Sequence, residues 1–149
     1  MSEREQFLNL FWEMQPKFSR FYARALNEMD LSISQYALLN QLAVSGGPMT
    51  EISCKLHVSK PAVTNLVDRL EKKKMIKRVA HPKDRRVYLL EIQPKGEKIV
   101  REIQSEILKF LLKTFDQLNA AERKSLVRFY ALISKTIDEV LFEPCGTKT

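Results

Sequence analysis

One stretch decides the fold of this chain: SKPAVTNLVDRLEKKKMIKRVAHPKDRRVYLLEI, which runs from Ser59 to Ile92. Its first half spaces apolar residues by three and four, which lines them on one helix face; they are Val63, Leu66, Val67 and Leu70. Ser59 can cap this helix, and Pro61 falls in the first turn, where its missing N–H is tolerated. Two short apolar strands follow, near MIKRVA and RVYLLEI, joined by a turn around HPKDR. The stretch predicts a helix followed by a β-hairpin.

Three helices are expected before this stretch. The segment from about Arg4 to Met29 repeats aromatic and apolar residues at helical spacing. Pro16 removes a hydrogen bond inside it, so the helix either bends there or starts afresh. Ser34 can cap a second helix through Val44, and Thr50 can cap a short one, EISCKL. A short turn, LHVS, separates this third helix from the helix that Ser59 caps.

After the hairpin, Pro94 opens a helical tract through about Leu118, and NAAE caps a last helix that ends at Leu141. Two short helices and a hairpin in this order predict a winged helix-turn-helix. The fold class is therefore mainly α with a small β-hairpin wing, in which a winged helix-turn-helix is joined to a helical dimerisation region. We expect residues 1–30 to form an N-terminal helix of the dimerisation region, residues 31–96 the DNA-binding lobe, and residues 97–149 the C-terminal dimerisation helices.

Positive charge is concentrated in the middle of the chain. The 149 residues carry 25 Lys+Arg and 18 Asp+Glu, for a net charge of +7. Residues 31–98 hold 13 Lys+Arg against 6 Asp+Glu, so the whole excess lies there. A charge placed in this way favours a polyanionic partner. No apolar run approaches the ~18 residues of a membrane helix, and the first residues do not read as a signal peptide. We expect a cytoplasmic protein without a membrane partner.

Four pieces of the chain together resemble the MarR (multiple antibiotic resistance regulator) family in order and spacing: LSISQYALLNQL, MTEISCKLHVSKPAVTNLVDRLEKKKMIKR, DRR and PKG. The likeness covers Leu31 to Gly96. It departs from the family at Lys74, where members usually have Gly at the helix end, and at Gln93, where they often have Thr. A left-handed residue at Lys74 would cost roughly 1 kcal/mol.

The helix after the short turn is expected to enter the major groove with its N-terminal residues. The candidate DNA-reading residues are Ser59, Lys60, Pro61, Ala62, Thr64 and Asn65. Asn65 can read adenine, and Lys60 can donate to guanine or to a phosphate. Solvated helix polars are the alternative interpretation of the same residues.

The hairpin tip carries Lys83, Arg85 and Arg86, which suits a wing laid over the DNA backbone with one arginine in the minor groove. The family resemblance implies that Arg85 is the inserted one. Arg86 is then expected to fold back to a carboxylate, with Asp68 as the candidate, and so to anchor the wing. Asp84 is expected to shape the turn. The alternative is a solvated charged hairpin.

Apolar stripes on the terminal helices exceed what one small module needs for its core, which predicts a two-fold homodimer that reads a pseudo-palindrome. The alternative is a monomer with a larger helical core. The resemblance further implies a repressor released by a small aromatic or phenolic effector. The effector is expected to bind in a cleft, and the candidate lining residues lie on the first helix: Trp12, Phe18, Arg20, Phe21, Tyr22 and Arg24. The alternative is that these aromatic residues belong to the core.

Other chemistry has little support in the sequence. The only histidines are His57 and His81, and no nucleophile elbow or Gly-rich phosphate loop occurs, so we expect no enzyme and no cofactor. Cys54 and His57 spell C-x-x-H without the second pair that a structural zinc needs. Neither Cys54 nor Cys145 matches the placement of the reactive cysteine in peroxide-sensing members of the family. A redox-responsive regulator of this fold and a winged helix that binds RNA or protein remain as alternatives to a sequence-specific regulator that binds double-stranded DNA.

Overall fold

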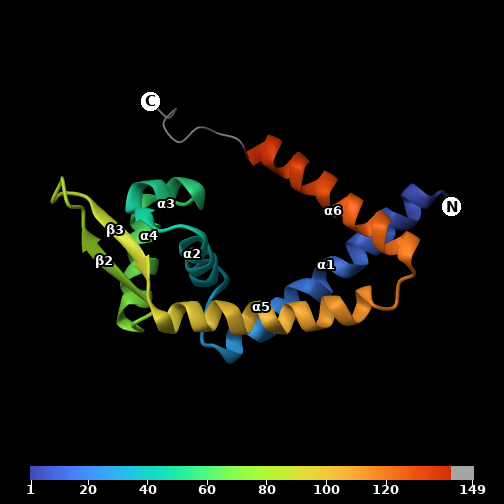
Figure 1. Ribbon diagram of the computed structural model, residues 1–149, viewed down its shortest axis with the longest axis horizontal. Helices are drawn as coiled ribbons and strands as arrows, with labels where there is room; N and C mark the ends of the chain where they lie inside the picture. Colours follow the sequence, from blue (N-terminus) through green and yellow to red (C-terminus); the bar gives the residue numbers. More distant parts are fainter. Residues whose placement is uncertain (142–149) are drawn as a thin grey trace. The chain divides into compact units, whose positions relative to one another are not determined.

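The computed structural model describes residues 1–141 of the chain. They divide into two compact units, one formed by residues 1–104 and one that begins at Ser105. Six helices and three short strands occur in the described part of the chain (Figure 1). Among these helices, none has both the length and the apolar character that crossing a membrane requires.

The first unit holds α1 (Glu3–Glu28), α2 (Ile33–Val44), α3 (Met49–Lys55) and α4 (Lys60–Lys72), and α5 (Pro94–Phe115) begins in it. The predicted helices are thus confirmed, with ends that differ by a few residues. Pro16 lies inside α1, which does not start afresh there.

Two of the predicted helix caps are wrong. Ser32, and not Ser34, caps α2, because Ser32 and Gln35 close a capping box in which each side chain accepts from the other residue's backbone N–H. Ser34 lacks a partner glutamine at this spacing, which decides between the two serines. Helix α3 begins at Met49 after Pro48, without a side-chain cap, so that Thr50 lies within the helix.

The sheet contains one more strand than the predicted hairpin. Strands β2 (Ile76–Ala80) and β3 (Tyr88–Ile92) pair antiparallel, from Ile76 opposite Ile92 to Ala80 opposite Tyr88. The two-residue strand β1 (Gly47–Pro48) pairs with the other edge of β3, which gives the order β1-β3-β2. The hairpin is confirmed, and its base is fixed on both edges.

The core of the first unit lies between α2, α4 and the sheet. Leu38, Ile52, Val67 and Leu90 are fully buried there. The predicted apolar face of α4 is confirmed, since its Val63, Val67 and Leu70 side chains are inaccessible to solvent.

Gly96, in the PKG segment, lies where only glycine fits. A Cβ at Gly96 would lie 2.4 Å from the backbone oxygen of Met75. That oxygen also accepts a hydrogen bond from the backbone N–H of Gln93, at 2.8 Å, so it is held in place. The first turn of α5 can therefore pack directly on the start of β2.

Helices α1, α3 and α4 each end on a left-handed residue that is not glycine. These residues are Asp30, His57 and Lys74, with φ of 52°, 51° and 59°. At the end of α4, the N–H groups of Lys74 and Met75 donate to the carbonyls of Glu71 and Leu70. This pattern is a Schellman motif, which satisfies the last carbonyls of a helix. Lys74 thus takes the left-handed conformation although it is not glycine.

The second unit contains the end of α5 and α6 (Ala120–Leu141). Asn119 caps α6, since its side chain accepts from the N–H groups of Ala121 and Glu122. Arg123 places its guanidinium 5.3 Å from the ring centre of Phe115. No residue of α6 is buried, although the helix is rich in apolar side chains.

Candidate nucleic-acid interface

The N-terminal half of α4 presents the predicted DNA-reading residues to solvent. All six of them are exposed, whereas Val63 between them is fully buried; they are Ser59, Lys60, Pro61, Ala62, Thr64 and Asn65. The Ser59 hydroxyl accepts from the N–H of Ala62 at 3.4 Å, which confirms its role as the cap. The Thr64 hydroxyl donates to the carbonyl of Lys60 at 3.0 Å. The ends of Lys60 and Asn65 are the longer polar groups on this surface.

The turn between α3 and α4 holds the start of α4 against the lobe. The buried Ser53 donates its hydroxyl to the carbonyl of Val58 at 2.7 Å, and the N–H of Val58 donates back to the carbonyl of Ser53. His57 takes the left-handed conformation at the corner. The chain therefore turns within three residues, Leu56 to Val58, and α4 starts with its N-terminal residues exposed to solvent.

The turn of the wing is built by Asp84. Its carboxylate accepts from the N–H of Arg86 at 3.0 Å, and its carbonyl accepts from the N–H of Val87 at 3.0 Å. The N–H of His81 donates to the carbonyl of Val87 at 2.9 Å, which closes the base of the loop. The predicted role of Asp84 is confirmed. Because the turn uses backbone groups and one acid, the side chains of Lys83, Arg85 and Arg86 all remain exposed.

A cavity of about 310 Å³ joins the start of α4 to the base of the wing. Seven residues line it: Met49, Thr50, Lys60, Thr64, Arg86, Val87 and Tyr88. The fold thus brings Lys60 and Thr64 of α4 to the same hollow as Arg86. Arg85 does not line this hollow.

The predicted pairing of Arg86 with Asp68 is replaced by another contact. Asp68 accepts from the guanidinium of Arg78, on β2, and a second nitrogen of Arg78 donates to Glu71. The N–H of Arg78 also donates to Glu71, at 3.2 Å. Arg86 lies before the start of β3, in the turn of the wing. Arg78 lies within β2, the strand that packs on α4, so Arg78 reaches both acids of that helix. Asp68 anchors the sheet through Arg78.

Arg78 is not among the candidate site residues predicted from the sequence. Its side chain is only 22% exposed, against 51% for its neighbour Lys77. Burial alone would lower the pKa of Arg78, but the hydrogen bond that Arg78 donates to Asp68 and the negative charge of Glu71 raise this pKa above the usual value. Strand parity was the available signal, since Arg78 shares a face with the buried Ile76.

The six effector candidates all lie on α1 but do not share one face. Phe18 and Phe21 are half-buried, whereas Trp12 is 63% exposed. Arg20 and Arg24 are exposed, and Arg24 pairs with Glu28 at 3.3 Å. At 100° per residue the two arginines lie about opposite the Phe18–Tyr22 side of the helix. Burial raises the pKa of Tyr36 on α2, and the neighbouring Tyr22 raises it further.

Cys54 belongs to no candidate metal site among the described residues. Cys54 is half-buried in α3, and Cys145 lies outside residues 1–141. Within those residues, no group of three or more His, Cys, Asp or Glu side chains is arranged to hold a metal ion.

Comparison with known proteins agrees with this geometry. The MarR family model matches residues 31–88. The uncharacterized HTH-type transcriptional regulator YsmB of Bacillus subtilis is 33% identical over 109 residues, which cover 69% of this chain and 74% of YsmB.

Solved structures share the fold at lower identity. Rv1404 from Mycobacterium tuberculosis has a TM-score of 0.78 at 22% identity, over 91% of this chain and 94% of that one. FabT of Streptococcus pneumoniae, in complex with DNA, has a TM-score of 0.75 at 19% identity, over 90% of this chain and 99% of FabT. The family match, the identity to YsmB and the winged helix-turn-helix lobe lead to one conclusion: the chain belongs to the MarR family, whose members are transcriptional regulators and not enzymes.

Proposed function

We propose that the chain binds double-stranded DNA sequence-specifically, as a homodimer on a pseudo-palindromic operator, and acts as a repressor. The observation that carries this proposal is the exposed polar start of α4 beside an exposed arginine wing on one lobe. Lys60, Thr64 and Arg86 line the same hollow, so helix and wing form one continuous surface. The structural neighbour FabT, solved in complex with DNA, supports the use of this fold to bind DNA.

In this proposal, the start of α4 enters the major groove, because only the N-terminal residues of a recognition helix reach the base edges. Asn65 pairs with adenine, and Lys60 with guanine or a phosphate. Pro61 and Ala62 offer apolar contact to a thymine methyl group. Ser59 and Thr64 complete the surface, with hydroxyls already engaged by the helix backbone.

The wing supplies the second contact. Arg85 is proposed to enter the minor groove, while Lys83 and Arg86 lie along phosphates, since cations placed there add affinity that falls with salt. Arg78 holds β2 to α4 through two carboxylates of that helix. The distance between helix and wing is thereby set before DNA is met, which lowers the ordering cost of binding.

The proposed dimer rests on apolar surface that one chain leaves open. On α1, Leu10 and Trp12 are 59% and 63% exposed, and on α6, Tyr130 and Val140 are 59% and 75% exposed. Large exposed apolar patches mark interaction surfaces. A second copy of the chain buries them and supplies the second recognition helix. We also propose that a small aromatic effector acts beside the Phe18, Phe21 and Tyr22 side of α1 by favouring a lobe arrangement that no longer fits the operator.

The test begins by selecting bound duplexes from a random pool, followed by mobility-shift titration of the recovered site at several salt concentrations. We expect a palindrome and a steep salt slope. Asn65→Ala should cost about 1–3 kcal/mol and relax the preference at one base position. Lys83→Ala should reduce the salt slope by about 1 for each wing that contacts the duplex.

Two controls separate an effect on DNA recognition from an effect on the stability of the fold. Arg85→Ala should weaken binding severely while leaving the thermal midpoint unchanged, because Arg85 is exposed at the wing tip. Lys98→Ala removes the same charge from an exposed position on α5 and should leave DNA binding unchanged. Light scattering should give twice the mass of one chain. A monomer, or a set of variants that bind the selected duplex like the unaltered protein, overturns the proposal.

A further inference from the structure

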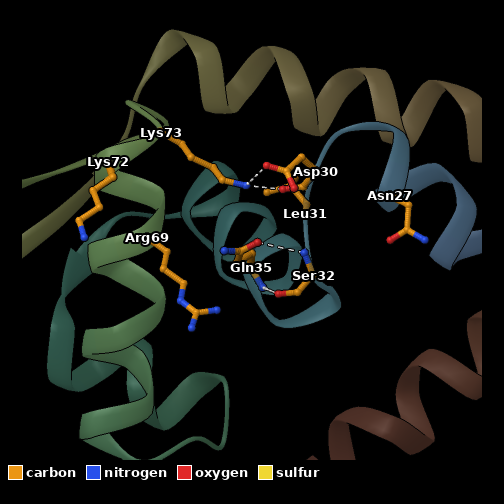
Figure 2. A pocket seen from close by; sticks show the side chains of 8 residues that line it. All are labelled: Asn27, Asp30, Leu31, Ser32, Gln35, Arg69, Lys72 and Lys73. Carbon is orange, nitrogen blue, oxygen red and sulfur yellow. Dashed lines mark hydrogen bonds and ion pairs between the residues drawn. The ribbon is translucent and has the colours of Figure 1, made fainter.

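A second basic hollow lies at the other end of α4. It encloses about 590 Å³ between the end of α1, the start of α2 and the last turns of α4, all within the first unit. Figure 2 shows its eight lining residues; they are Asn27, Asp30, Leu31, Ser32, Gln35, Arg69, Lys72 and Lys73. None of them belongs to the proposed DNA surface.

The hollow has more positive charge than its own acid can neutralise. Lys73 pairs with Asp30 at 2.8 Å and also donates to the Asp30 carbonyl, and this contact lowers the pKa of Asp30. The side chains of Arg69 and Lys72 are exposed and make no hydrogen bond or ion pair within residues 1–141. Two cations of the lining therefore have no counter-charge.

Helix α2 begins at the edge of this hollow, where Ser32 and Gln35 belong to the lining. The N–H groups of Ile33 and Ser34 belong to the first turn of that helix and have no intrahelical acceptor. The 12-residue helix also adds the positive end of its dipole. A helix start alone does not make a site, but one buried side chain of this helix also has a donor group that is not used within the described residues.

That side chain is Gln35, which is only 6% exposed. Its Oε1 accepts from the N–H of Ser32 at 3.0 Å, which fixes the orientation of the amide. The amide NH₂ group is then left with no hydrogen-bond acceptor among the described residues, and Figure 2 shows its nitrogen on the side that faces α4. Every fully buried side-chain nitrogen or oxygen of the described residues has a partner, so this nitrogen is open to the hollow that Gln35 lines.

We propose that this hollow binds a dianionic oxyanion, namely phosphate or the phosphate group of a phosphomonoester. Arg69 and Lys72 supply two positive charges, which suits a dianion better than a single carboxylate. The guanidinium, the ammonium and the Gln35 amide provide donors from α4 and from α2, and phosphate offers enough oxygens to accept from both.

The DNA backbone is not the source of this phosphate. Lys72 is twelve residues beyond Lys60 on α4, a separation of about 18 Å along the helix axis. When the start of α4 lies in the major groove, its end points away from the duplex. The ligand is therefore a small molecule, and its contacts join the last turns of the recognition helix to α1 and α2. Binding at this site does not depend on the proposed function.

The test is a titration of ¹⁵N-labelled full-length protein, followed by NMR, at about pH 7, where phosphomonoesters are largely dianions. Inorganic phosphate, glycerol 3-phosphate and acetate are added in turn at constant ionic strength. We expect saturable shifts of the Gln35 side-chain NH₂ and of the Ile33 and Ser34 amides with phosphate, with glycerol 3-phosphate, or with both. Binding of only one of the two tells whether the free ion or the ester is the ligand.

Two double variants with the same loss of charge give the control. Arg69→Gln with Lys72→Gln should weaken phosphate binding at least tenfold, whereas Lys83→Gln with Arg85→Gln should leave it unchanged. Equal binding by both double variants, shifts that do not saturate, or acetate binding as tightly as phosphate overturns the proposal. Loss of DNA binding in the wing variant, with phosphate binding retained, shows that the two sites fail separately.

Discussion

Arg78 offers the sharpest test of how the lobe holds together. It joins β2 to α4 through Asp68 and Glu71, and its side chain is 22% exposed against 49% and 39% for its partners. Arg78→Gln keeps a polar side chain but removes the charge and the fork of donors. The two carboxylates would then lie three residues apart on α4 without their cation.

The expected cost follows from these exposures. An exposed ion pair stabilises a protein by about 0.2–1 kcal/mol, and a hydrogen bond to a charged group contributes about 1.5–3 kcal/mol when it is sheltered. Both acids stay in contact with water and can be hydrated, so the loss should be nearer the lower values. We expect Arg78→Gln to lower the free energy of unfolding by about 1–2 kcal/mol.

The measurement is a double-mutant cycle in urea, with Arg78→Gln and Asp68→Asn made singly and together at one chain concentration. The matched control is the neighbouring cross-strand pair Lys77–Glu91, which is 3.0 Å apart with both side chains about half exposed. The coupling energy should be about 1 kcal/mol for the first pair and about 0.3 kcal/mol for the second.

An additive result for Arg78 and Asp68 would refute the assignment of Asp68 as the anchor of the sheet. Coupling of equal size in both pairs would mean that burial adds nothing to the contact. Arg78→Gln should also lower the affinity for the operator, because the sheet that Arg78 holds to α4 carries the wing. Operator affinity that stays unchanged in Arg78→Gln, with the coupling lost, would show that the wing finds its place without this contact.

Three further predictions concern single positions. Gly96→Ala should lower the free energy of unfolding by about 1–3 kcal/mol in urea, because its Cβ would meet the Met75 carbonyl; Lys98→Ala, on the exposed side of the same helix, is the neutral control. Lys74→Gly should stabilise the protein by about 1 kcal/mol, seen as a rise of about 2–4 °C in the thermal midpoint, whereas Lys74→Ala should not. Because Lys73 lowers the pKa of Asp30 below 3.8, the stability difference between the unaltered protein and Asp30→Asn should hold at neutral pH and vanish as the pH falls through that lowered pKa.

The local features of the lobe could be predicted from sequence because they depend on neighbours in the chain. The apolar face of α4, its Ser59 cap and the Asp84 turn each follow from spacing within a few residues. The start of α2 was missed by two residues, since LSIS offers two serines and only the contact with Gln35 separates them. Strand β1 has two residues, too few for any periodic pattern.

Features that join distant segments were predicted less well. Asp68 was identified as an anchor, but its partner was wrong because several cations follow α4 and sequence alone does not order them by distance. The second basic hollow was not predicted, since it unites residues of α1, α2 and α4 that no motif connects. The buried Gln35 looked like an ordinary polar residue of a helix until its surroundings were known.

The left-handed residues Asp30, His57 and Lys74 affect how easily the helix ends beside them open locally. When such a helix end unfolds locally, its left-handed residue can return to a common backbone conformation. This change lowers the free energy of the locally open form. Amide protons at these helix ends should accordingly exchange with solvent sooner than those in the middle of the same helices. Local opening should therefore be concentrated at the turns that join the helices and strands, while the middles of the helices stay protected.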